Sequence, residues 1–343
     1  MQPESTGAQR SDPAAPKRYV FLLIPGFSPL GLTCAQEALA LANRFAGGRR
    51  RYYDWRLISA DAAPVKAWNG VRMMVDDGLI ELRRDDTLIV CAGVDAASGS
   101  AKEVLNWLRR ETRKGMDYGA LSSGTLTLAM AGLLDGKRVT THWEYVDAME
   151  ETFAQVEVQQ SIYTVDGRVF TCAGSASSMD LMLDRINGDY GVELATWVAD
   201  QMVYTAPRTD KHAQRVSIAG RTGLRHSKLV DAIELMRENL EDPIPPAAIA
   251  EEVGLSVRQL ERLFARYMNS SPKKYYLGLR LERARNLLVQ TDLSLMEICV
   301  MCGFKAPSHF SKTYRKTFGV APSRDTGGSN LLFPGRQQNE EET

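Results

Sequence analysis

The C-terminal part of the chain contains an internal repeat, and no other feature of the sequence limits the possible fold as strongly. Residues 254–272 (GLSVRQLERLFARYMNSSP) align with residues 303–322 (GFKAPSHFSKTYRKTFGVAP), so that Gly254 corresponds to Gly303, 49 residues further along. After a one-residue insertion four more pairs align at a separation of 50 residues: Leu260 with Phe310, Phe264 with Tyr314, Met268 with Phe318 and Pro272 with Pro322. Such a repeat indicates that one supersecondary unit occurs twice.

Each copy has the order of a helix-turn-helix motif. A short helical stretch ends at the aligned glycine, Gly254 in the first copy and Gly303 in the second. A turn follows, and a second helix begins a few residues later. In the second copy Ser294 and Glu297 form a capping-box pair at the start of the helix that ends at Gly303. In the first copy Pro246 suits the opening turn of its helix. The sequence therefore predicts two such units, joined by a long helix over residues 275–293.

The second helix of each unit separates apolar from polar side chains. The expected apolar stripes are Leu260, Leu263, Phe264 and Tyr267 in the first copy, and Phe310, Tyr314 and Phe318 in the second. The residues predicted to face DNA are Arg258, Gln259, Arg262 and Arg266 in the first copy, and Ser308, His309, Ser311, Lys312 and Arg315 in the second. In a major groove, Arg reads guanine and Gln reads adenine, whereas Lys and Ser reach phosphates.

Charge favours DNA over the alternative of a solvated basic face on a helical bundle. The whole chain has a formal net charge of zero, yet residues 255–318 carry 12 Lys/Arg against 4 Asp/Glu, a surplus of 12 − 4 = 8. A local surplus of positive charge indicates a polyanionic partner for that region. With the joining helix as spacer, both second helices are expected to meet one face of the duplex about 34 Å apart.

Residues 19–204 alternate between short apolar runs and amphipathic helical stretches. Continuously apolar runs are typical of strands that are buried on both faces of a parallel sheet, and here they cover residues 19–24, 54–60, 86–93 and 117–121. A hairpin is expected over residues 161–174 with its turn at Asp166-Gly167, followed by helices near 175–187 and 192–203. The fold class predicted is α/β: a flavodoxin-like α/β sandwich followed by an all-α domain.

These patterns divide the chain into five parts. We expect a disordered arm over 1–18, the α/β domain over 19–204, a linker over 205–226, the double helix-turn-helix domain over 227–325 and a disordered tail over 326–343. No apolar run approaches the roughly 20 residues of a membrane span, and the first residues lack a signal peptide. The five scattered cysteines suit a reducing cytoplasm. The sequence predicts a cytoplasmic protein that has no membrane partner.

Cys299 and Cys302 form a CxxC pair, which raises the alternative of a metal or redox site. Both lie among apolar residues at helical spacing, and no second Cys/His pair stands nearby. Packing inside a helical core is the favoured interpretation. We therefore expect no bound metal and no cofactor.

Residues 227–322 resemble the AraC/XylS family of transcription regulators. The segments that carry the resemblance are LVDAIELMRENLEDPI, LERLFARYMNSSPKKYYLGLRLERARNLL and HFSKTYRKTFGVAPS. The resemblance implies promoter DNA and RNA polymerase as partners. The family usually follows the final Pro-Ser with an aromatic residue and Arg, whereas this chain has RDTGG. The last helix is therefore expected to be shorter.

Residues 19–204 resemble the glutamine-amidotransferase-like domain of PfpI type that occurs in GlxA-like regulators of the AraC family. The segments FLLIPGFSPLGLTCAQEALALAN, AGLLDGKRVTTHWEYVD and SSGT carry this resemblance. Enzymes of that superfamily place a cysteine on the strand-to-helix elbow, where this chain has Ser122 in DYGALSSG. A serine hydroxyl needs an adjacent base to become nucleophilic, and His142 is the only histidine before residue 212.

The elbow supports two hypotheses. One is an active amidohydrolase or protease-like enzyme that uses Ser122 and His142 and carries a DNA-binding tail. The favoured one is a pocket without catalysis at the carboxyl ends of the strands. Its expected ligand-binding residues are Ser122, Ser123, Gly124, His142, Trp143, Gly26 and Phe27. His142 can equally cap a helix, and a tryptophan such as Trp143 is more often a core residue.

The sequence as a whole predicts a transcription regulator and not an enzyme. We expect an activator of a catabolic operon, active as a homodimer, that responds to a small polar metabolite such as an amino acid or a quaternary amine. Trp143 would stack on such a cation. A third alternative is a nucleoid-type structural protein that binds DNA without sequence preference.

Overall fold

The computed structural model describes residues 15–93, 96, 100–205, 207–212, 214 and 227–325. The chain divides into two compact units, Met1–Arg215 and Val216–Thr343. Most of the predicted arm and all of the predicted tail lie outside the described residues. The first strand begins at Lys17, two residues inside the segment expected to be an arm.

The N-terminal unit is built on a six-stranded sheet with the order β2-β1-β5-β6-β10-β9. The strands are β1 (Lys17–Leu23), β2 (Tyr53–Ile58), β5 (Thr87–Cys91), β6 (Asp117–Leu121), β9 (Tyr163–Asp166) and β10 (Val169–Cys172). The first five strands in that order run parallel, and β9 alone pairs antiparallel, with β10. The hairpin at Asp166-Gly167 and the four predicted parallel strands are confirmed.

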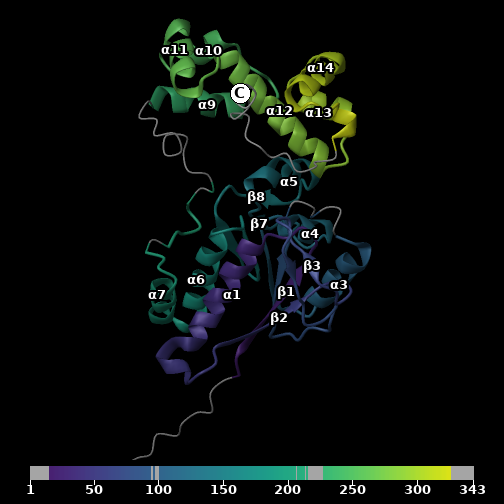
Figure 1. Ribbon diagram of the computed structural model, residues 1–343, viewed down its shortest axis with the longest axis vertical. Helices are drawn as coiled ribbons and strands as arrows, with labels where there is room; N and C mark the ends of the chain where they lie inside the picture. The colour runs from purple at the N-terminus through teal and green to yellow at the C-terminus, as the bar shows by residue number, and fades with distance from the viewer. Residues whose placement is uncertain are drawn as a thin grey trace, which may run out of the picture. The chain divides into compact units, whose positions relative to one another are not determined.

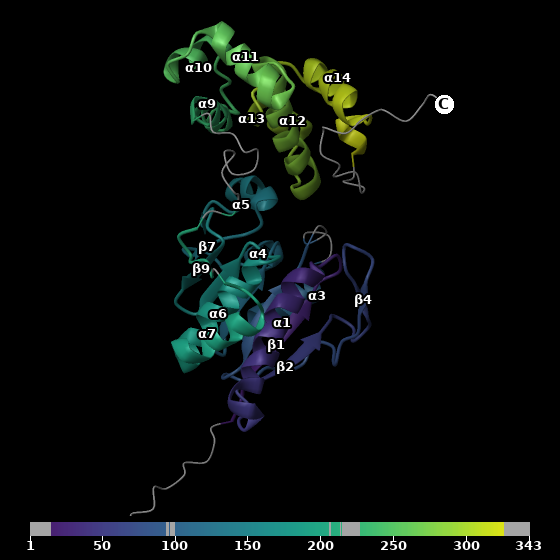
Figure 2. The ribbon, with the colours of Figure 1, turned by 60° about the vertical axis from the view of Figure 1, so that its left-hand side comes forward.

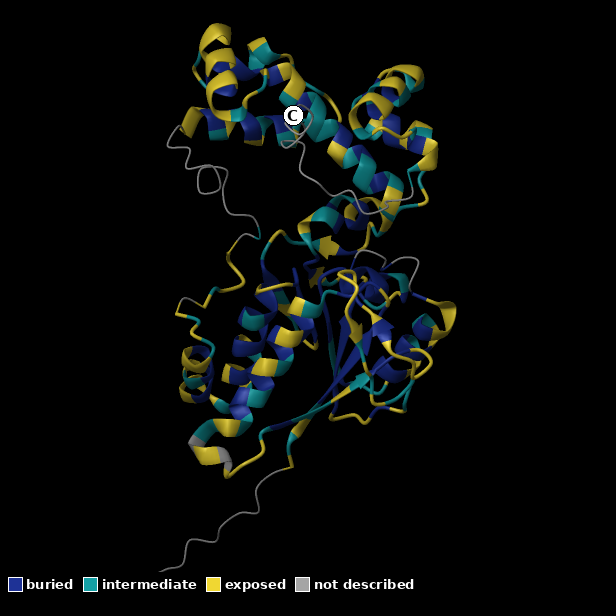
Figure 3. Cartoon of the chain, viewed as in Figure 1, coloured by how far each residue is buried: buried dark blue, intermediate teal, exposed yellow. Residues whose placement is uncertain are grey.

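Helices cover both faces of this sheet, as Figures 1 and 2 show. Tyr19, Phe21 and Leu23 of β1 pack in one core with α1 (Pro29–Arg44), α6 (Ser177–Tyr190) and α7 (Val192–Gln201). The alternate residues Val20, Leu22 and Ile24 pack in a second core with α3 (Lys102–Thr112) and α4 (Gly124–Met130). Successive side chains of a strand point to opposite faces, so an apolar strand such as β1 serves two cores. Figure 3 shows the buried strands between these helix layers. The predicted flavodoxin-like architecture is confirmed.

Short elements complete the N-terminal unit. They are η1 (Phe45–Gly48), β3 (Val65–Lys66), β4 (Arg72–Met73), β7 (Arg138–Val139), η2 (Trp143–Tyr145), α5 (Val146–Thr152) and β8 (Glu157–Val158). β3 pairs with β4 and β7 with β8, each pair forming a separate small sheet. Two-residue strands carry no readable alternation, which is why the sequence did not predict them.

The C-terminal unit consists of helices around two cores at the ends of one long helix. Its elements are α9 (Ser227–Glu238), α10 (Pro246–Glu252), α11 (Val257–Met268), α12 (Pro272–Gln290), α13 (Leu295–Met301), α14 (Pro307–Phe318) and η3 (Pro322–Arg324). Leu260 and Phe264 pack in the first core, and the aligned Phe310 and Tyr314 in the second. Figure 1 shows α10 and α11 near one end of α12, and α13 and α14 near the other. The duplicated helix-turn-helix is thereby confirmed.

The described residues bear on the membrane and metal alternatives. None of the described helices is long and apolar enough to cross a membrane. The described residues contain no cluster of three or more His, Cys, Asp or Glu that could hold a metal ion. Cys299 and Cys302 are buried in the second core of the C-terminal unit. This position agrees with the interpretation that the CxxC pair packs inside a helical core.

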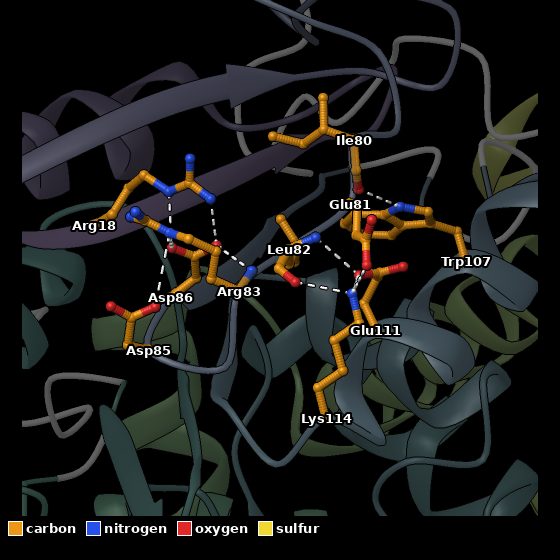
Figure 4. A network of polar contacts seen from close by, with 10 residues as sticks. All are labelled: Arg18, Ile80, Glu81, Leu82, Arg83, Asp85, Asp86, Trp107, Glu111 and Lys114. Carbon is orange, nitrogen blue, oxygen red and sulfur yellow. Dashed lines mark hydrogen bonds and ion pairs between the residues drawn. The ribbon is translucent and has the colours of Figure 1, made fainter.

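A network of buried carboxylates fixes the loop that leads into β5 (Figure 4). Asp86 accepts hydrogen bonds from Arg18 Nε and Nη2 at 2.7 and 2.5 Å, and from the Arg83 backbone N–H at 2.7 Å. Glu111 accepts from the Leu82 N–H at 2.9 Å and from Lys114 Nζ at 2.8 Å. Burial opposes ionisation of both carboxyls, but these donors outweigh it and hold both pKa values below their ordinary range.

This network predicts a loss of stability in acid. The ordinary pKa values are 3.8 for Asp86 and 4.5 for Glu111; because the folded values lie lower, the unfolded chain takes up protons first as the pH falls. We expect Asp86→Asn to lower the free energy of unfolding by about 1.5–3 kcal/mol at neutral pH, the range for hydrogen bonds to charged groups. The difference from wild type should shrink below about pH 4. Urea unfolding across this pH range measures it, and a difference that stays constant would contradict the assignment.

Candidate DNA-binding surface and elbow site

The start of α11 is fixed by a capping box that the sequence interpretation missed. Gly254 takes a φ of +64°, which turns the chain after α10. Ser256 then caps α11: its Oγ accepts from the Gln259 N–H at 3.3 Å, and Gln259 Oε1 accepts from the Ser256 N–H at 2.8 Å. The Ser-x-x-Gln signal is readable in the sequence. In the second copy the predicted Ser294–Glu297 box opens α13 and is confirmed.

One row of α11 carries the predicted basic side chains. Arg258, Arg262 and Arg266 follow one another at intervals of four residues and are all exposed, so they lie along one side of the helix. Leu260, Leu263 and Phe264 are buried on the other side. Tyr267, expected in the apolar stripe, is 40% exposed, and the Arg266 guanidinium lies 5.3 Å from its ring centroid. The prediction for Tyr267 was wrong: near the end of α11 the neighbouring Met268 packs against the core, whereas Tyr267 is exposed.

The predicted base-reading role of Gln259 competes with its observed role in the capping box. A bidentate contact with adenine needs both the amide oxygen and the amide nitrogen. The oxygen already accepts from the Ser256 N–H, so reading adenine in this way would break the capping box. A donor contact through Nε2 alone keeps the cap intact.

The surface of α14 follows the prediction with one exception. Ser308, His309, Lys312 and Arg315 are exposed, whereas Ser311 is half-buried. Phe310 and Tyr314 are fully buried, and Phe318 packs against the same core. Lys305, which the sequence interpretation did not single out, is exposed just before α14. It lines a hollow together with His309 and Arg280.

Contacts around Gly303 tie the second helix-turn-helix to the rest of the C-terminal unit. Gly303 has a φ of +70°, and an added Cβ would lie 2.6 Å from the Glu241 carbonyl oxygen and from Pro243. Arg280 of α12 donates to the carbonyl oxygens of Cys302 and Gly303 at 2.8 and 2.6 Å. These contacts hold the turn of the second motif against both α12 and the loop after α9.

The final helical turn is short, as the departure from the family pattern predicts. η3 covers only Pro322–Arg324. Asp325 follows it and accepts from the Tyr314 hydroxyl at 2.8 Å and from Arg285 Nε at 3.0 Å. The carboxylate of Asp325 therefore links the end of the unit to α14 and to α12.

The elbow after β6 has a strained serine at its tip. Ser122 has a φ of +60°, in the left-handed region of the backbone that residues other than glycine seldom adopt. Its N–H donates to the Cys172 carbonyl oxygen at 2.9 Å. An added Cβ at Gly174 would lie 2.6 Å from Ser122 Cβ, so β10 and β6 end in close contact. Ser122 is 8% exposed, and an observed strain of this kind is a sign of a functional position.

The segments expected around the elbow converge on the Gly93 carbonyl oxygen. It accepts from Ser123 Oγ at 2.5 Å and from the Tyr145 hydroxyl at 3.1 Å, and Gly93 forms an isolated bridge with Phe27. The Phe27 side chain is fully buried in the core, and Gly26 and Gly124 are buried as well. The structure therefore brings together the three segments that contain the predicted residues, but Ser123 and Phe27 are engaged in internal contacts. The positions of Ser123 and Phe27 in the sequence do not predict these internal contacts.

His142 and Trp143 lie at the start of η2. His142 is its N-cap, with Nδ1 accepting from the Glu144 N–H at 3.4 Å. The His142 and Trp143 ring centroids are 5.4 Å apart, and Trp143 is 37% exposed. Thr141, the preceding residue, donates through Oγ1 to the Ser122 carbonyl oxygen at 3.2 Å. The helix-capping alternative for His142 is the one observed, and an exposed Trp143 is not a core residue.

A second aromatic residue near the elbow escaped the sequence interpretation. The Trp68 N–H donates to the Phe27 carbonyl oxygen at 3.2 Å, and the Gly26 N–H donates to the Lys66 carbonyl oxygen at 2.9 Å. The segment between β3 and β4 thus borders the turn after β1, and Trp68 is 61% exposed. No local pattern in the sequence indicates this long-range contact.

An α/β domain followed by two helix-turn-helix motifs with basic outer faces defines a class of protein, the two-domain DNA-binding regulators. Residues 249–326 match the family model of a helix-turn-helix domain, and residues 16–187 match the DJ-1/PfpI family. The chain is 42% identical to the HTH-type transcriptional regulator CdhR of Pseudomonas aeruginosa, over 92% of this chain and 93% of that protein. It is 34% identical to the HTH-type transcriptional regulator GlxA of Rhizobium meliloti, over 92% of this chain and 97% of that protein.

The chain belongs to the AraC family of transcription regulators, in the GlxA-like group with an N-terminal DJ-1/PfpI domain. A ThiJ/PfpI family protein from Pseudomonas syringae has a similar fold: its crystal structure covers 69% of this chain and 93% of its own, with 19% identity and a TM-score of 0.51. The predicted family is confirmed, and the protein is a DNA-binding transcription regulator.

Proposed function

We propose that the protein is a cytoplasmic, sequence-specific activator of a catabolic operon that responds to a small polar metabolite. The observation that carries this proposal is the pair of exposed polar and basic rows on α11 and α14, each opposite a buried apolar face of the same unit. Arginine at base-edge positions supports selective binding, which disfavours the nucleoid-type alternative. Activation implies contact with RNA polymerase, and a homodimer would recognise two half-sites.

The elbow supports an amino acid or a quaternary amine as the effector. Trp143 offers an exposed aromatic surface next to the His142 ring, which suits a cation. α4 has only seven residues, so its N-terminus alone does not account for binding of a carboxylate. The proposal depends instead on the convergence of the β1 turn, the elbow and η2 on Gly93. We propose that residues 19–204 form the ligand-sensing domain and that the chain stays bound to this domain as far as Gln214.

A ligand screen tests the proposed function. Amino acids, betaines and polyamines are added to the full chain in thermal unfolding. A ligand at 100 times its dissociation constant should stabilise the protein by about 2.7 kcal/mol. Trp143→Ala should remove most of this stabilisation, whereas Trp55→Ala in edge strand β2 should lose only general stability and keep the ligand response. Loss of the ligand response in Trp55→Ala, or no response to any member of the panel, would contradict the proposed site.

The strained elbow also favours a second candidate function, hydrolysis through Ser122. A nucleophilic serine needs an adjacent base that accepts its proton. Nδ1 of His142 lies against the Glu144 N–H and carboxylate, and it is the Thr141 hydroxyl of this segment that contacts Ser122. We therefore propose that the elbow binds without catalysis. Ser122→Ala is expected to retain full DNA affinity and to change no turnover of amide or ester substrates, as measured by product release. Turnover in the wild type that disappears in Ser122→Ala would instead assign an active hydrolase.

A further inference from the structure

The chain leaves the N-terminal unit through a segment that is bound to it at two places. At the first, Arg208 donates to the fully buried Asp180 carboxylate from its backbone N–H at 2.7 Å, from Nε at 3.1 Å and from Nη2 at 2.7 Å. The Tyr204 hydroxyl donates to the same carboxylate at 2.8 Å. This segment was expected to be part of a linker, but residues 207–214 are anchored where they are described. We call the described residues of this segment, 207–212 and 214, the exit strap.

The second place is centred on Gln214. Its Nε2 donates to Thr140 Oγ1 at 2.9 Å, to the Thr141 carbonyl oxygen at 2.7 Å and to the Ser161 carbonyl oxygen at 3.1 Å. The Gln214 N–H donates to the Gln160 carbonyl oxygen at 3.2 Å, and the Ile162 N–H donates to the His212 carbonyl oxygen at 2.9 Å. The exit strap therefore docks by side-chain and backbone hydrogen bonds together.

The residues that receive Gln214 also contact the elbow. Thr141 Oγ1 donates to the Ser122 carbonyl oxygen at 3.2 Å, and the Thr140 carbonyl oxygen accepts from Thr125 Oγ1 at 2.8 Å. Thr141 is followed directly by His142. Thr140 and Thr141 thus stand between the strained serine on one side and the exit strap on the other. Any shift of this pair alters both.

The docking of Gln214 is incomplete. Its Oε1 atom is buried and has no hydrogen-bond partner among the described residues. A buried acceptor without a donor costs about 1–3 kcal/mol, comparable to what the bonds at Nε2 contribute. This cost offsets part of what the side-chain and backbone hydrogen bonds contribute, so we infer that the docked state is favoured by a margin on the order of 1–3 kcal/mol. A ligand can shift the populations of two states separated by such a margin.

We propose that the exit strap is a regulatory element through which the elbow site sets the reach of the DNA-binding unit; this inference rests on the proposed effector site. With Gln214 docked, 12 residues (215–226) separate it from the first residue of α9. Released as far as Thr209, the strap leaves 18 residues (209–226) between the anchored Arg208 and α9. At about 3.3 Å per residue the largest possible separation rises from about 40 to about 60 Å. Binding of the effector at the elbow would favour either the docked or the released strap, and so one of these two maximum separations.

Trypsin digestion of the full chain measures the docking directly, because Lys211 lies inside the exit strap and is exposed. Gln214→Met keeps the length of the side chain but removes its hydrogen bonds. We expect cleavage after Lys211 to accelerate about tenfold in this variant, since the rate follows the population of the released strap. Hydrogen exchange at the Ile162 amide should accelerate in parallel. The matched control Gln201→Met, at the exposed end of α7, should leave both rates unchanged.

A second variant tests the connection with the elbow. Thr141→Val removes the hydroxyl that binds the Ser122 carbonyl oxygen but retains the backbone oxygen that accepts from Gln214. We expect it to change the cleavage rate after Lys211 by at least about threefold, on the scale of one hydrogen bond. Thr152→Val, on the exposed end of α5, is its control. An unchanged rate in Thr141→Val would overturn the coupling to the elbow.

Small-angle scattering tests the effect on reach. The radius of gyration of full-length Gln214→Met should exceed that of the wild type and of Gln201→Met. Equal radii together with faster cleavage would overturn the proposed control of reach, and unchanged cleavage in Gln214→Met would overturn the exit strap itself. None of these measurements uses an effector or DNA. If they succeed while the ligand screen fails, the proposed function falls and the exit strap stands.

Discussion

Gly124→Ala is expected to destabilise the N-terminal unit by about 3 kcal/mol or more, the upper range for overpacking a closed core. Gly124 is the first residue of α4, directly after the elbow. A Cβ at this position would lie 2.3 Å from the Val90 carbonyl oxygen and 3.3 Å from Ala120 Cβ. Neither neighbour can move easily, because Val90 and Ala120 belong to the central strands β5 and β6. Urea unfolding followed by circular dichroism measures the loss.

The matched control is Gly188→Ala in α6. Nothing lies within 4 Å of an added Cβ at Gly188, and the residue is helical. Alanine there should stabilise the unit by roughly 0.5–1 kcal/mol, because glycine is the poorer helix former. Opposite signs for the two variants would establish that Gly124 is required by the close approach of α4 to the sheet. Equal and small effects would contradict the packing at the elbow.

This packing bears on how the elbow should be interpreted. Gly124 was predicted to line a ligand site, and its position beside Val90 gives it a structural reason to be glycine. Ser122 has a left-handed backbone and lies against Gly174, and its carbonyl oxygen accepts from Thr125 Oγ1 of α4 at 3.4 Å. Variants of Gly124 report on folding and not on binding.

The sequence predicted the sheet and the duplicated motif because both depend on local pattern. The apolar run that contains Val20, Phe21 and Leu22 has apolar side chains on both faces of the strand, so both faces must be buried against helices. β1 accordingly contributes to both cores. In the C-terminal unit, the aligned Leu260 and Phe310 keep their register with the core in both copies. Apolar residues that repeat at a helical or strand period lie on one face of the element, and that face packs in the core, so such patterns can be predicted from the sequence.

Features that depend on long-range contacts could not be predicted. Residues 207–214 carry no period, yet Arg208 meets Asp180 and Gln214 meets Thr141 across the fold. The same is true of Trp68, which reaches the turn after β1 through backbone hydrogen bonding. The sequence placed the elbow and His142 in one neighbourhood by resemblance, but the direction of each side chain is decided by packing. Ser123 and Phe27 turn inward for that reason.

Arg258→Ala and Arg262→Ala are each expected to weaken binding to the specific promoter site by about 1–3 kcal/mol, or roughly 5- to 150-fold. Both side chains are exposed on α11, four residues apart on the side opposite the buried Leu260 and Phe264. An arginine that donates two hydrogen bonds to guanine loses discrimination when it is removed, so binding to unrelated DNA should change much less. The full chain is titrated with DNA from upstream of its own gene and with a scrambled duplex.

The controls separate base reading from general attraction. Arg113→Ala makes the same change of charge at an exposed residue after α3, and it should leave both affinities unchanged. Lys312→Ala on α14 should weaken specific and scrambled DNA alike and reduce the slope of log affinity against log salt by about 1, as expected for a phosphate contact. The two arginines lie four residues apart on one side of α11, so the double variant is expected to lose less than the sum of the single losses. Equal losses on specific and scrambled DNA for Arg258→Ala and Arg262→Ala would assign these residues to the phosphate backbone and leave base recognition to α14.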